Sequence, residues 1–253
     1  MGLLTEGITF SYGSSCVLKG IGFELKPGEI LGIIGPNGSG KTTLIKCINR
    51  ILEPSQGTIT FDAQDILSMK IRDVARIMGY VPQASLDSLA SPTVFEVVMM
   101  GRMPYSTWQS SDKDRNVSWK ALDDVDMREF ATVPFRNLSS GQMQRVLMAR
   151  ALAQEAKILL LDEPTSNLDL KFQREIMEVI SELVKTKGVS ACMILHDMDA
   201  VMKYCDKAVI LNDGVVTAAG DVEKVLTAEN IRDTFDVEVV IDHSYGRPHV
   251  VVL

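Results

Sequence analysis

The sequence predicts an α/β fold built on a largely parallel sheet. Three continuous apolar runs, at 29–35, 157–164 and 190–197, are typical of strands that are buried on both faces. Helical patterns alternate with these runs, at about 141–154 and 170–187. Because crossover helices join the strands of a parallel sheet, this alternation predicts that the sheet is mainly parallel.

The first apolar run ends at a glycine and leads into a helical segment. The segment KTTLIKCINRIL predicts a helix that begins at residue 41 and ends before Glu53 and Pro54. Elsewhere in the first quarter of the chain, apolar and polar residues alternate, with Gly or Pro between the segments, which predicts antiparallel strands. These segments are 3–10, 17–25 and 57–62. We therefore expect an N-terminal antiparallel β subdomain beside the parallel sheet.

The middle of the chain has a different character. Residues 84–137 are richer in Ser, Asp and Met and show helical periodicity, which predicts a helical subdomain inserted between two parts of the sheet. The tail 237–253 predicts a terminal β-hairpin around SYGR. We expect one domain over residues 1–253. Its parts would be a core of 1–83 and 150–220, a helical subdomain of 84–149, and a C-terminal helix and hairpin of 221–253.

Composition narrows the function. The 253 residues carry 26 Lys and Arg against 33 Asp and Glu, and the net charge of −7 argues against a nucleic-acid partner. The four cysteines form no C-x-x-C pair, which suits a reducing cytoplasm. The N-terminus lacks the pattern of a signal peptide, and no apolar run approaches the ~18 residues of a membrane span. If the protein works at a membrane, we expect it to dock on a partner there.

A glycine-rich stretch between the first buried strand and its helix predicts a phosphate-binding loop. GPNGSGKT fits G-x-x-x-x-G-K-[ST] at every fixed position, and a plain glycine-rich turn is the less specific alternative. Backbone N–H groups would surround the phosphates of ATP, Lys41 would reach the β- and γ-phosphates, and the Thr42 hydroxyl would bind Mg²⁺. The sequence thus predicts a P-loop NTPase core. The expected nucleotide contacts are Gly35, Pro36, Asn37, Gly38, Ser39, Gly40, Lys41, Thr42 and Thr43.

Two adjacent carboxylates end the second buried strand. The run ILLLDEP places Asp162 and Glu163 there. Consecutive strand residues face opposite ways, but where a strand ends the chain can turn both side chains toward one pocket. We expect Asp162 to hold Mg²⁺ and Glu163 to act as the general base for an attacking water. Solvated charges at a strand end are the alternative.

These motifs belong to an ordered set that resembles an ATP-binding cassette (ABC) ATPase. The resemblance spans residue 3 to about 220, and it implies that Tyr12 stacks on adenine, Gln83 contacts Mg²⁺ or the attacking water, Asp169 contacts an opposing subunit, and His196 touches the γ-phosphate. Singly, each has a plainer reading, such as strand packing for Tyr12 or a strand-end polar group for Gln83 and His196. The set comprises Tyr12, the P-loop, Gln83, LSSGQ (138–142), LLLDEP (159–164), SNLD (166–169) and His196.

The stretch NLSSGQMQR predicts a second anion-binding helix start, because Ser and Gly leave backbone N–H groups open there. The resemblance implies that Ser139, Gly141 and Gln142 bind the ATP held by the P-loop of a second copy of the chain. Each chain would then carry two half-sites, which a homodimer completes around ATP. Two residues depart from the family pattern. Ser140 replaces a second glycine, which matters only if that position needs a positive φ, and Met143 replaces a basic residue.

Within the family, VVMMGRMPY (97–105) and the tail after the core resemble importers of iron chelates, haem and cobalamin. This implies a peripheral ATPase on the cytoplasmic face of the cell membrane, with two transmembrane permease subunits and, indirectly, a substrate-binding protein as partners. Residues 84–105 would form the docking groove, with Met99, Met100 and Met103 as adaptable apolar contacts.

The alternatives are three other classes of P-loop protein. The main alternative is a soluble ABC ATPase of iron–sulfur cluster assembly. A DNA-repair or chromosome-organising ATPase would carry long heptad repeats, and the chain has none. A P-loop kinase would need neither LSSGQ nor the segment around His196. The cargo is not encoded, because it would touch the membrane subunits and not this chain.

Overall fold

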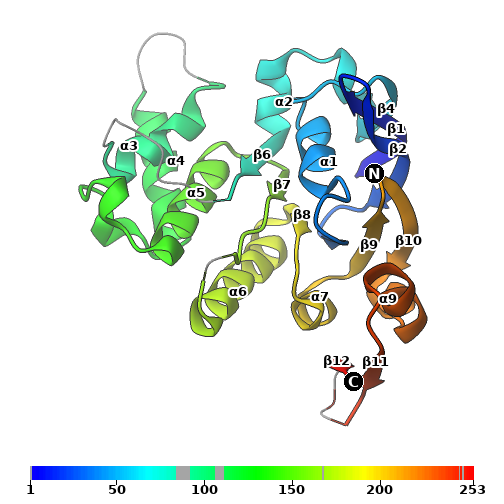
Figure 1. Ribbon diagram of the computed structural model, residues 1–253. Helices are drawn as coiled ribbons and strands as arrows, with labels where there is room; N and C mark the ends of the chain where they lie inside the picture. The colour runs from blue at the N-terminus through cyan, green and yellow to red at the C-terminus, as the bar shows by residue number, and fades with distance from the viewer. Residues whose placement is uncertain (1, 84–91, 106–110, 167, 245, 247) are drawn as a thin grey trace.

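The computed structural model describes residues 2–83, 92–105, 111–166, 168–244, 246 and 248–253 (Figure 1). Two sheets lie on one side of the molecule and a group of helices lies on the other, while the C-terminal segment projects below the sheets (Figure 1). None of the helices in these described ranges has both the length and the apolar character that crossing a membrane requires.

A six-stranded sheet forms the centre, and five of its strands are parallel. The sixth, β10, pairs antiparallel with β9 at one edge. The mainly parallel sheet predicted from the sequence is therefore confirmed. In spatial order the strands are β10 (Val215–Asp221), β9 (Lys207–Asn212), β3 (Ile30–Ile34), β8 (Ser190–Ile194), β7 (Ile158–Leu161) and β6 (Met78–Val81).

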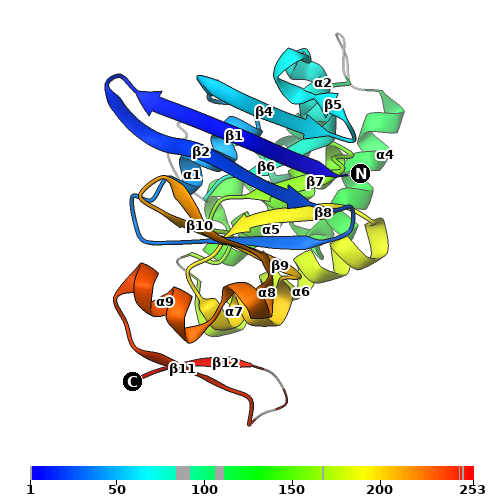
Figure 2. The ribbon, with the colours of Figure 1, turned by 90° about the vertical axis from the view of Figure 1, so that its right-hand side faces the viewer.

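A four-stranded antiparallel sheet packs against the central one (Figure 2). Its longest strand pair, β1 with β2, aligns Leu3 with Leu25, and Leu3 also faces Phe61 on the other side. The alternating segments near the N-terminus thus form antiparallel strands, as predicted. In spatial order these are β2 (Ser15–Leu25), β1 (Leu3–Tyr12), β4 (Gln56–Phe61) and β5 (Gln64–Asp65).

The central sheet separates two hydrophobic cores. In β3, Leu31 and Ile33 face the core that is shared with the antiparallel sheet, whereas Ile30 and Ile34 face the opposite core. Helix α1 (Lys41–Ile48) fills the first core, and α6 (Leu170–Lys187) and α7 (Met198–Tyr204) cover the second face. Each fully buried Leu or Ile contributes about 1.5–3 kcal/mol relative to exposure, so burial on both faces fixes the sheet.

The helical group lies beside the sheet and not on it (Figure 1). It contains the predicted helix at 141–154, observed as α5 (Ser140–Ala153), together with α3 (Val94–Met99) and α4 (Asp112–Asp123). One further helix, α2 (Ile71–Ile77), leads into β6. Short 3₁₀ turns lie between the longer elements, at η1 (Ile66–Ser68), η2 (Met100–Arg102), η3 (Arg128–Phe130) and η4 (Phe135–Asn137).

The C-terminal segment contains short helices and the predicted hairpin. After β10 come α8 (Val222–Val225) and α9 (Ala228–Phe235). The strands β11 (Val239–Asp242) and β12 (His249–Val252) then pair antiparallel. Of the four turn residues in SYGR, Tyr245 and Arg247 lie outside the described residues.

The helix after the P-loop is shorter than predicted. It ends at Ile48 and not at residue 52, because Arg50 takes a left-handed φ of 55°. The amide of Ile51 then bonds the Lys46 carbonyl at 2.9 Å, and the amide of Arg50 bonds the Cys47 carbonyl at 3.0 Å, which is a Schellman ending. The Arg50 guanidinium donates to the carbonyls of Ile66 and Met69, and these bonds hold the unusual conformation.

Candidate functional site

Four parallel strands deliver polar residues to one edge of the central sheet. The P-loop follows β3, Gln83 follows β6, Asp162 and Glu163 follow β7, and His196 follows β8. Because carboxyl ends of parallel strands meet at the same edge, residues far apart in sequence converge there, where α/β sheets bind ligands. The strand order explains why these motifs are close in space.

The P-loop is a cradle that needs glycine at specific positions. A Cβ on Gly35 would lie 1.9 Å from the Leu211 carbonyl oxygen. Gly40, at the N-cap of α1, has a φ of 104° and provides no side-chain cap, so the first N–H groups of the helix stay open. The cavity in front of them measures about 200 Å³. It is lined by Val17, Asn37, Gly38, Gly40, Lys41, Thr42, Thr43 and Glu163.

Two side chains in this cradle, Lys41 and Ser39, can donate hydrogen bonds to a phosphate. The Lys41 Nζ donates to the carbonyls of Gly35 and Pro36, each at 2.8 Å, so the ammonium is folded over its own loop. Burial lowers the pKa of Lys41, and the nearby carboxylates of Glu163 and Asp162 oppose that effect. The buried Ser39 hydroxyl has no hydrogen-bond partner within the described ranges. A phosphate group would supply acceptors for both residues, which fits the predicted ATP site.

The Asp162 carboxylate is held on both sides. Its Oδ1 accepts from Thr42 Oγ1 at 3.0 Å, and its Oδ2 accepts from the Tyr80 hydroxyl at 3.1 Å. Burial and the adjacent carboxylate raise the pKa of Tyr80, so the phenol remains a donor. The described part of the chain has no cluster of three His, Cys, Asp or Glu side chains that could hold a metal ion. The Thr42 hydroxyl and the Asp162 carboxylate are, however, oxygen donors that suit Mg²⁺ bound together with nucleotide phosphates.

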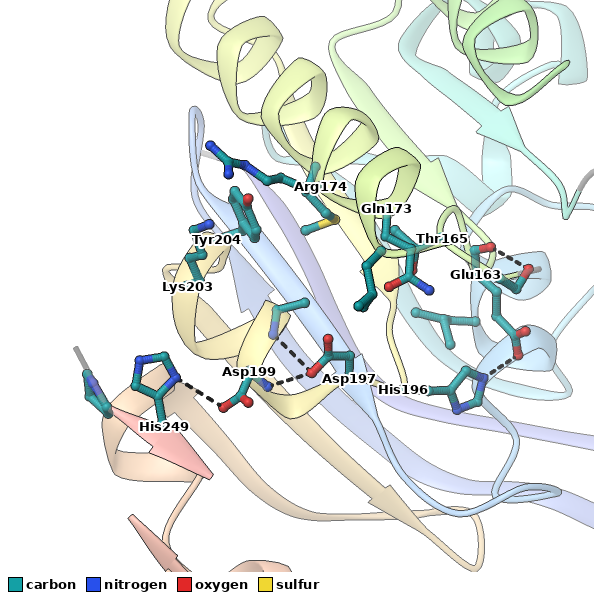
Figure 3. Close-up of a pocket in the computed structure, with 16 residues that line it drawn as sticks. Glu163, Thr165, Gln173, Arg174, His196, Asp197, Asp199, Lys203, Tyr204 and His249 are labelled. Carbon is teal, nitrogen blue, oxygen red and sulfur yellow. Dashed lines mark hydrogen bonds and ion pairs between the residues drawn. The ribbon is translucent and has the colours of Figure 1, made fainter. Parts of the chain in front are cut away.

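Glu163 occupies a strained position at the end of β7. Its φ is 52°, a left-handed conformation that costs roughly 1–2 kcal/mol for a residue with a Cβ. This turn lets Glu163 line the P-loop cavity while its neighbour Asp162 bonds Thr42. The Oε1 of Glu163 lies 2.7 Å from Nε2 of His196, as Figure 3 shows. Strain at a functional group is common where the surroundings hold it in a working geometry.

Gln83 joins the same group of residues. Its Nε2 donates to Glu163 Oε2 at 3.5 Å and to Ser166 Oγ at 2.9 Å. Ser166 in turn donates to the Glu163 carbonyl at 2.9 Å. Glu163 therefore contacts both Gln83 and His196, the two other residues that the sequence predicts to be catalytic. Their catalytic roles remain predictions.

A second cavity, of about 300 Å³, lies beside this cluster, between α6, α7 and the start of β12 (Figure 3). Glu163 and His196 lie at one end and Tyr204 at the other (Figure 3). The C-terminal hairpin is anchored here, because the Val250 amide donates to Asp199 Oδ1 at 2.8 Å and His249 lies 3.8 Å from the same oxygen. The hairpin thus closes one side of the cavity.

The predicted second anion site begins a helix. Ser139 caps α5 and accepts from the Gln142 amide at 3.3 Å, while Gln142 Oε1 accepts from the Ser139 amide at 3.0 Å. Ser140 is the first residue of the helix and is absent from the residues with positive φ, so this position does not need a glycine. Met143 is buried in the core. Ser139, Gly141 and Gln142 are not among the described residues that line the P-loop cavity.

Asp169 and Tyr12 have plain structural contacts as well. Asp169 caps α6 by accepting from the Phe172 amide at 3.0 Å. A Cβ on Gly141 would lie 3.3 Å from the Phe172 ring, so the starts of α5 and α6 touch. Tyr12 is 52% exposed at the end of β1 and packs edge-on against Phe10. Its predicted stacking on adenine, like the predicted intersubunit contact of Asp169, remains untested.

A groove of about 700 Å³ runs between the core and the helical group. Its walls carry four exposed apolar side chains, Ile51, Ile71, Met100 and Met103. Single exposed apolar residues are ordinary, whereas these four are gathered around one groove. Met99 is partly buried and does not line the groove. Of the three predicted methionine contacts, Met100 and Met103 therefore face this surface.

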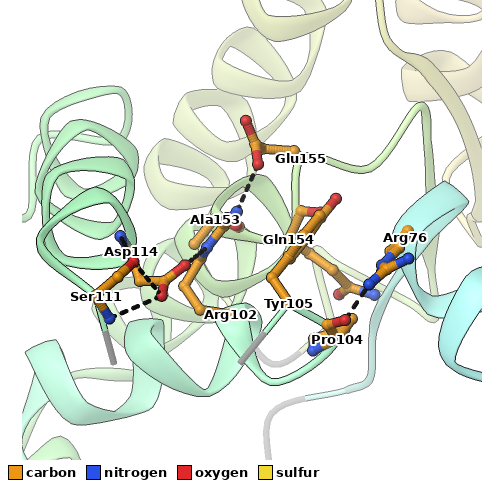
Figure 4. Close-up of polar contacts among 9 residues, drawn as sticks. All are labelled: Arg76, Arg102, Pro104, Tyr105, Ser111, Asp114, Ala153, Gln154 and Glu155. Atoms are coloured by element: carbon orange, nitrogen blue, oxygen red, sulfur yellow. Dashed lines mark hydrogen bonds and ion pairs between the residues drawn. The ribbon is translucent and has the colours of Figure 1, made fainter. Parts of the chain in front are cut away.

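A buried arginine anchors the groove wall (Figure 4). Arg102 donates to Asp114 at 2.9 Å, to Glu155 at 2.7 Å and to the Ala153 carbonyl at 2.5 Å. The Tyr105 ring packs against the Arg102 guanidinium, with 4.1 Å between the Arg102 Cζ and the ring centre. These bonds fix the GRMPY segment to α4 and to the end of α5.

Three residues in contact with the site were not predicted. Val17 lines the P-loop cavity, Ser166 bonds Gln83, and Tyr80 bonds Asp162. Ser166 was within the quoted SNLD motif but received no role. Tyr80 lies on β6, whose four residues MGYV are too short a run to predict a strand, so local patterns do not place it beside Asp162.

Known proteins have sequences similar to this chain along nearly its whole length. Residues 18–166 match the family model described as ABC transporter. An ABC transporter ATP-binding protein of Methanocaldococcus jannaschii is 42% identical, covering 98% of this chain and 97% of that protein. The petrobactin import ATP-binding protein of Bacillus anthracis is 38% identical, with coverage of 97% and 91%. The iron(3+)-hydroxamate import ATP-binding protein of Bacillus subtilis is 34% identical, with coverage of 97% and 93%.

Solved structures of ABC transporter proteins also have similar folds. A metal-chelate type ABC transporter in an inward-facing conformation superposes with a TM-score of 0.88 at 29% identity, covering 100% of this chain and 97% of that one. A dimeric ABC transporter cassette superposes with a TM-score of 0.73 at 26% identity, covering 87% of this chain and 98% of that one. These two likenesses confirm the predicted cassette fold.

Proposed function

The chain belongs to the ABC transporter family and carries its ATP-hydrolysing cassette, and from this premise we propose that it energises the uptake of a metal chelate such as an iron–siderophore, haem or cobalamin. The observation that carries the proposal is the convergence of the P-loop, Asp162, Glu163 and His196 on one edge of the sheet. Two relatives, named for petrobactin import and iron(3+)-hydroxamate import, support the substrate class.

In the proposed reaction, the open N–H groups at the start of α1 and the Lys41 ammonium bind the phosphates of ATP. Thr42 and Asp162 would hold Mg²⁺, which supplies charge neutralisation at the phosphates when bound. Glu163 takes a proton from the attacking water, whose oxygen bonds to the γ-phosphorus while the bond to the β-phosphate oxygen breaks and ADP leaves. His196, 2.7 Å from Glu163, orients that carboxylate and would contact the γ-phosphate. Gln83 holds the second oxygen of Glu163.

The ATP site is completed by a second copy of the chain. The helix start at Ser139 offers donors for an anion but does not line its own P-loop cavity within the described residues. A homodimer in which each Ser139 faces the other subunit's P-loop gives both half-sites a partner. The likeness to a dimeric cassette supports this arrangement. Binding of ATP would close the dimer and hydrolysis would release it.

The groove between the core and the helical group would receive the permease. Met100 and Met103 are flexible and apolar, and Ile51 and Ile71 face them from the core side. A helix of a transmembrane subunit that inserts here touches both parts of the cassette. The chain would therefore work at the cytoplasmic face of the membrane, bound to two permease subunits and indirectly to a substrate-binding protein.

Co-expression with transmembrane subunits encoded beside this gene tests the proposal. We expect co-purification, and faster ATP turnover in liposomes when the binding protein is loaded with a metal chelate. Met100→Asp should abolish co-purification and leave the ATP turnover of the isolated subunit intact. Thr186→Asp, on the exposed end of α6, introduces the same charge away from the groove as a control. Association with scaffold and desulfurase proteins, in place of a permease, would favour iron–sulfur cluster assembly instead.

A further inference from the structure

We infer that Tyr80 is a positioning residue that holds the Asp162 carboxylate for Mg²⁺ and links that carboxylate to the groove lined by Met100 and Met103. This inference rests on the proposed ATPase site and deepens it, because it names the side chain through which the groove acts on that site.

The first part of the link is the hydrogen bond from the Tyr80 hydroxyl to Asp162 Oδ2, at 3.1 Å. Thr42 already occupies Oδ1 at 3.0 Å. With a donor on each oxygen, the carboxylate has one orientation, and Tyr80 fixes the half that Thr42 does not reach. Partners of this kind, one step behind the metal ligands, set the geometry of metal sites and often change metal affinity when removed.

The second part is the position of Tyr80 in the wall of the groove. It lines the groove of about 700 Å³ together with Ile71, Ala75 and Met100. The same side chain therefore belongs to two surfaces, the groove and the site of Asp162. A group that enters the groove contacts Tyr80 directly, and one hydrogen bond separates that contact from the carboxylate.

The third part of the link is a contact between Tyr80 and α5, the helix that Ser139 caps. Arg150, in the last turn of α5, donates from Nη2 to the Tyr80 carbonyl at 3.2 Å and also lines the groove. The backbone of Tyr80 is thus held by α5, and its hydroxyl holds Asp162. The groove, α5 and the proposed metal site therefore share one residue.

Removing only the hydroxyl tests the positioning role. We compare the wild type, Tyr80→Phe and the control Tyr204→Phe, whose hydroxyl is buried without a partner in the described structure. Mn²⁺ binding in the presence of a non-hydrolysable ATP analogue is followed by electron paramagnetic resonance. Tyr80→Phe should weaken Mn²⁺ binding by roughly tenfold, whereas Tyr204→Phe and metal-free nucleotide binding should stay unchanged. An unaltered Mn²⁺ affinity in Tyr80→Phe, with an unaltered unfolding temperature, overturns the positioning role.

Filling the groove tests the link. Ala75→Trp places a large side chain in the groove, and its effect on Mn²⁺ affinity is measured in the wild-type background and in the Tyr80→Phe background, which completes a double-mutant cycle. We expect Ala75→Trp to change the Mn²⁺ affinity by at least roughly threefold when the Tyr80 hydroxyl is present, and to change it little in the Tyr80→Phe background. An equal shift in both backgrounds, or none in the wild type, overturns the link. All these measurements use the isolated subunit, so failed co-purification with a permease would refute the proposed transport role without affecting them.

Discussion

The Nε2 of His196 lies 2.7 Å from the Oε1 of Glu163, which joins the ends of the neighbouring strands β8 and β7. The contact depends on the left-handed turn at Glu163, whose φ is 52°. Without that turn the carboxylate would follow the alternation of the strand and leave the cavity that Lys41 and Thr42 line. Backbone strain at Glu163 and the contact with His196 are thus two aspects of one arrangement.

Loss of either partner of this pair should stop hydrolysis and spare binding. We expect Glu163→Gln and His196→Ala each to lower ATP turnover by at least roughly a hundredfold, the usual contribution of a positioned general base. Nucleotide affinity should persist, because the P-loop is intact. Phosphate release and fluorescent-nucleotide binding measure the two properties. The control is His249→Ala, which removes a different histidine–carboxylate contact, at 3.8 Å from Asp199, and should turn over ATP like the wild type.

The helix start at Ser139 should be needed for turnover but not for binding ATP. Ser139→Ala removes a helix cap worth about 1 kcal/mol and a donor for the partner's nucleotide. Gly141→Asp adds a carboxylate, with its Cβ 3.3 Å from the Phe172 ring. Thr93→Ala removes an equivalent capping box from α3 and separates lost stability from lost function. If Ser139→Ala hydrolyses ATP as fast as Thr93→Ala, the composite site is wrong.

Local patterns were enough to predict three of the four strands that carry the site, namely β3, β7 and β8. The run at 29–35 is apolar on both faces, and β3 is buried along its whole length. The same pattern occurs in β9, where Ala208 to Leu211 are all buried, so this strand was within reach of the same rule. The four residues of β6 form too short a run at the edge of the sheet, and this strand was missed.

Contacts between strands were beyond local patterns. Tyr80 meets Asp162 only because β6 pairs with β7, and nothing in MGYV indicates that neighbour. The left-handed turn at Glu163 is equally hidden, because this conformation is unfavourable for a glutamate and is imposed by the surrounding fold. Sequence predicts which groups reach the edge of the sheet, whereas strand order decides which of them touch.

The buried Arg102 should contribute more to stability than any exposed ion pair. Its side chain is 2% exposed and holds two carboxylates and a carbonyl. Arg102→Ala leaves Asp114 buried without its cation, which should lower the free energy of unfolding by roughly 3–5 kcal/mol. Urea denaturation measures the change. Arg128→Ala, which breaks an exposed pair with Asp123, is the control and should cost no more than about 1 kcal/mol. Equal losses in the two variants would contradict a structural role for the Arg102 network.

Asp114 should make the protein sensitive to acid. Hydrogen bonds from the Ser111 hydroxyl and amide, aided by Arg102, hold the pKa of Asp114 at about 2, below its ordinary value of 3.8. Because the unfolded chain binds this proton more readily, the stabilisation is complete above pH 4 and is lost as pH falls toward 2. Asp114→Asn should therefore be less stable than the wild type at neutral pH, and the difference should shrink between pH 4 and pH 2. Chemical denaturation across that pH range measures the difference in stability.

Asp112→Asn changes an exposed carboxylate in the same helical turn and should keep the acid dependence of the wild type. A constant difference between the wild type and Asp114→Asn across this range would show that the Ser111 and Arg102 bonds do not favour the ionised form.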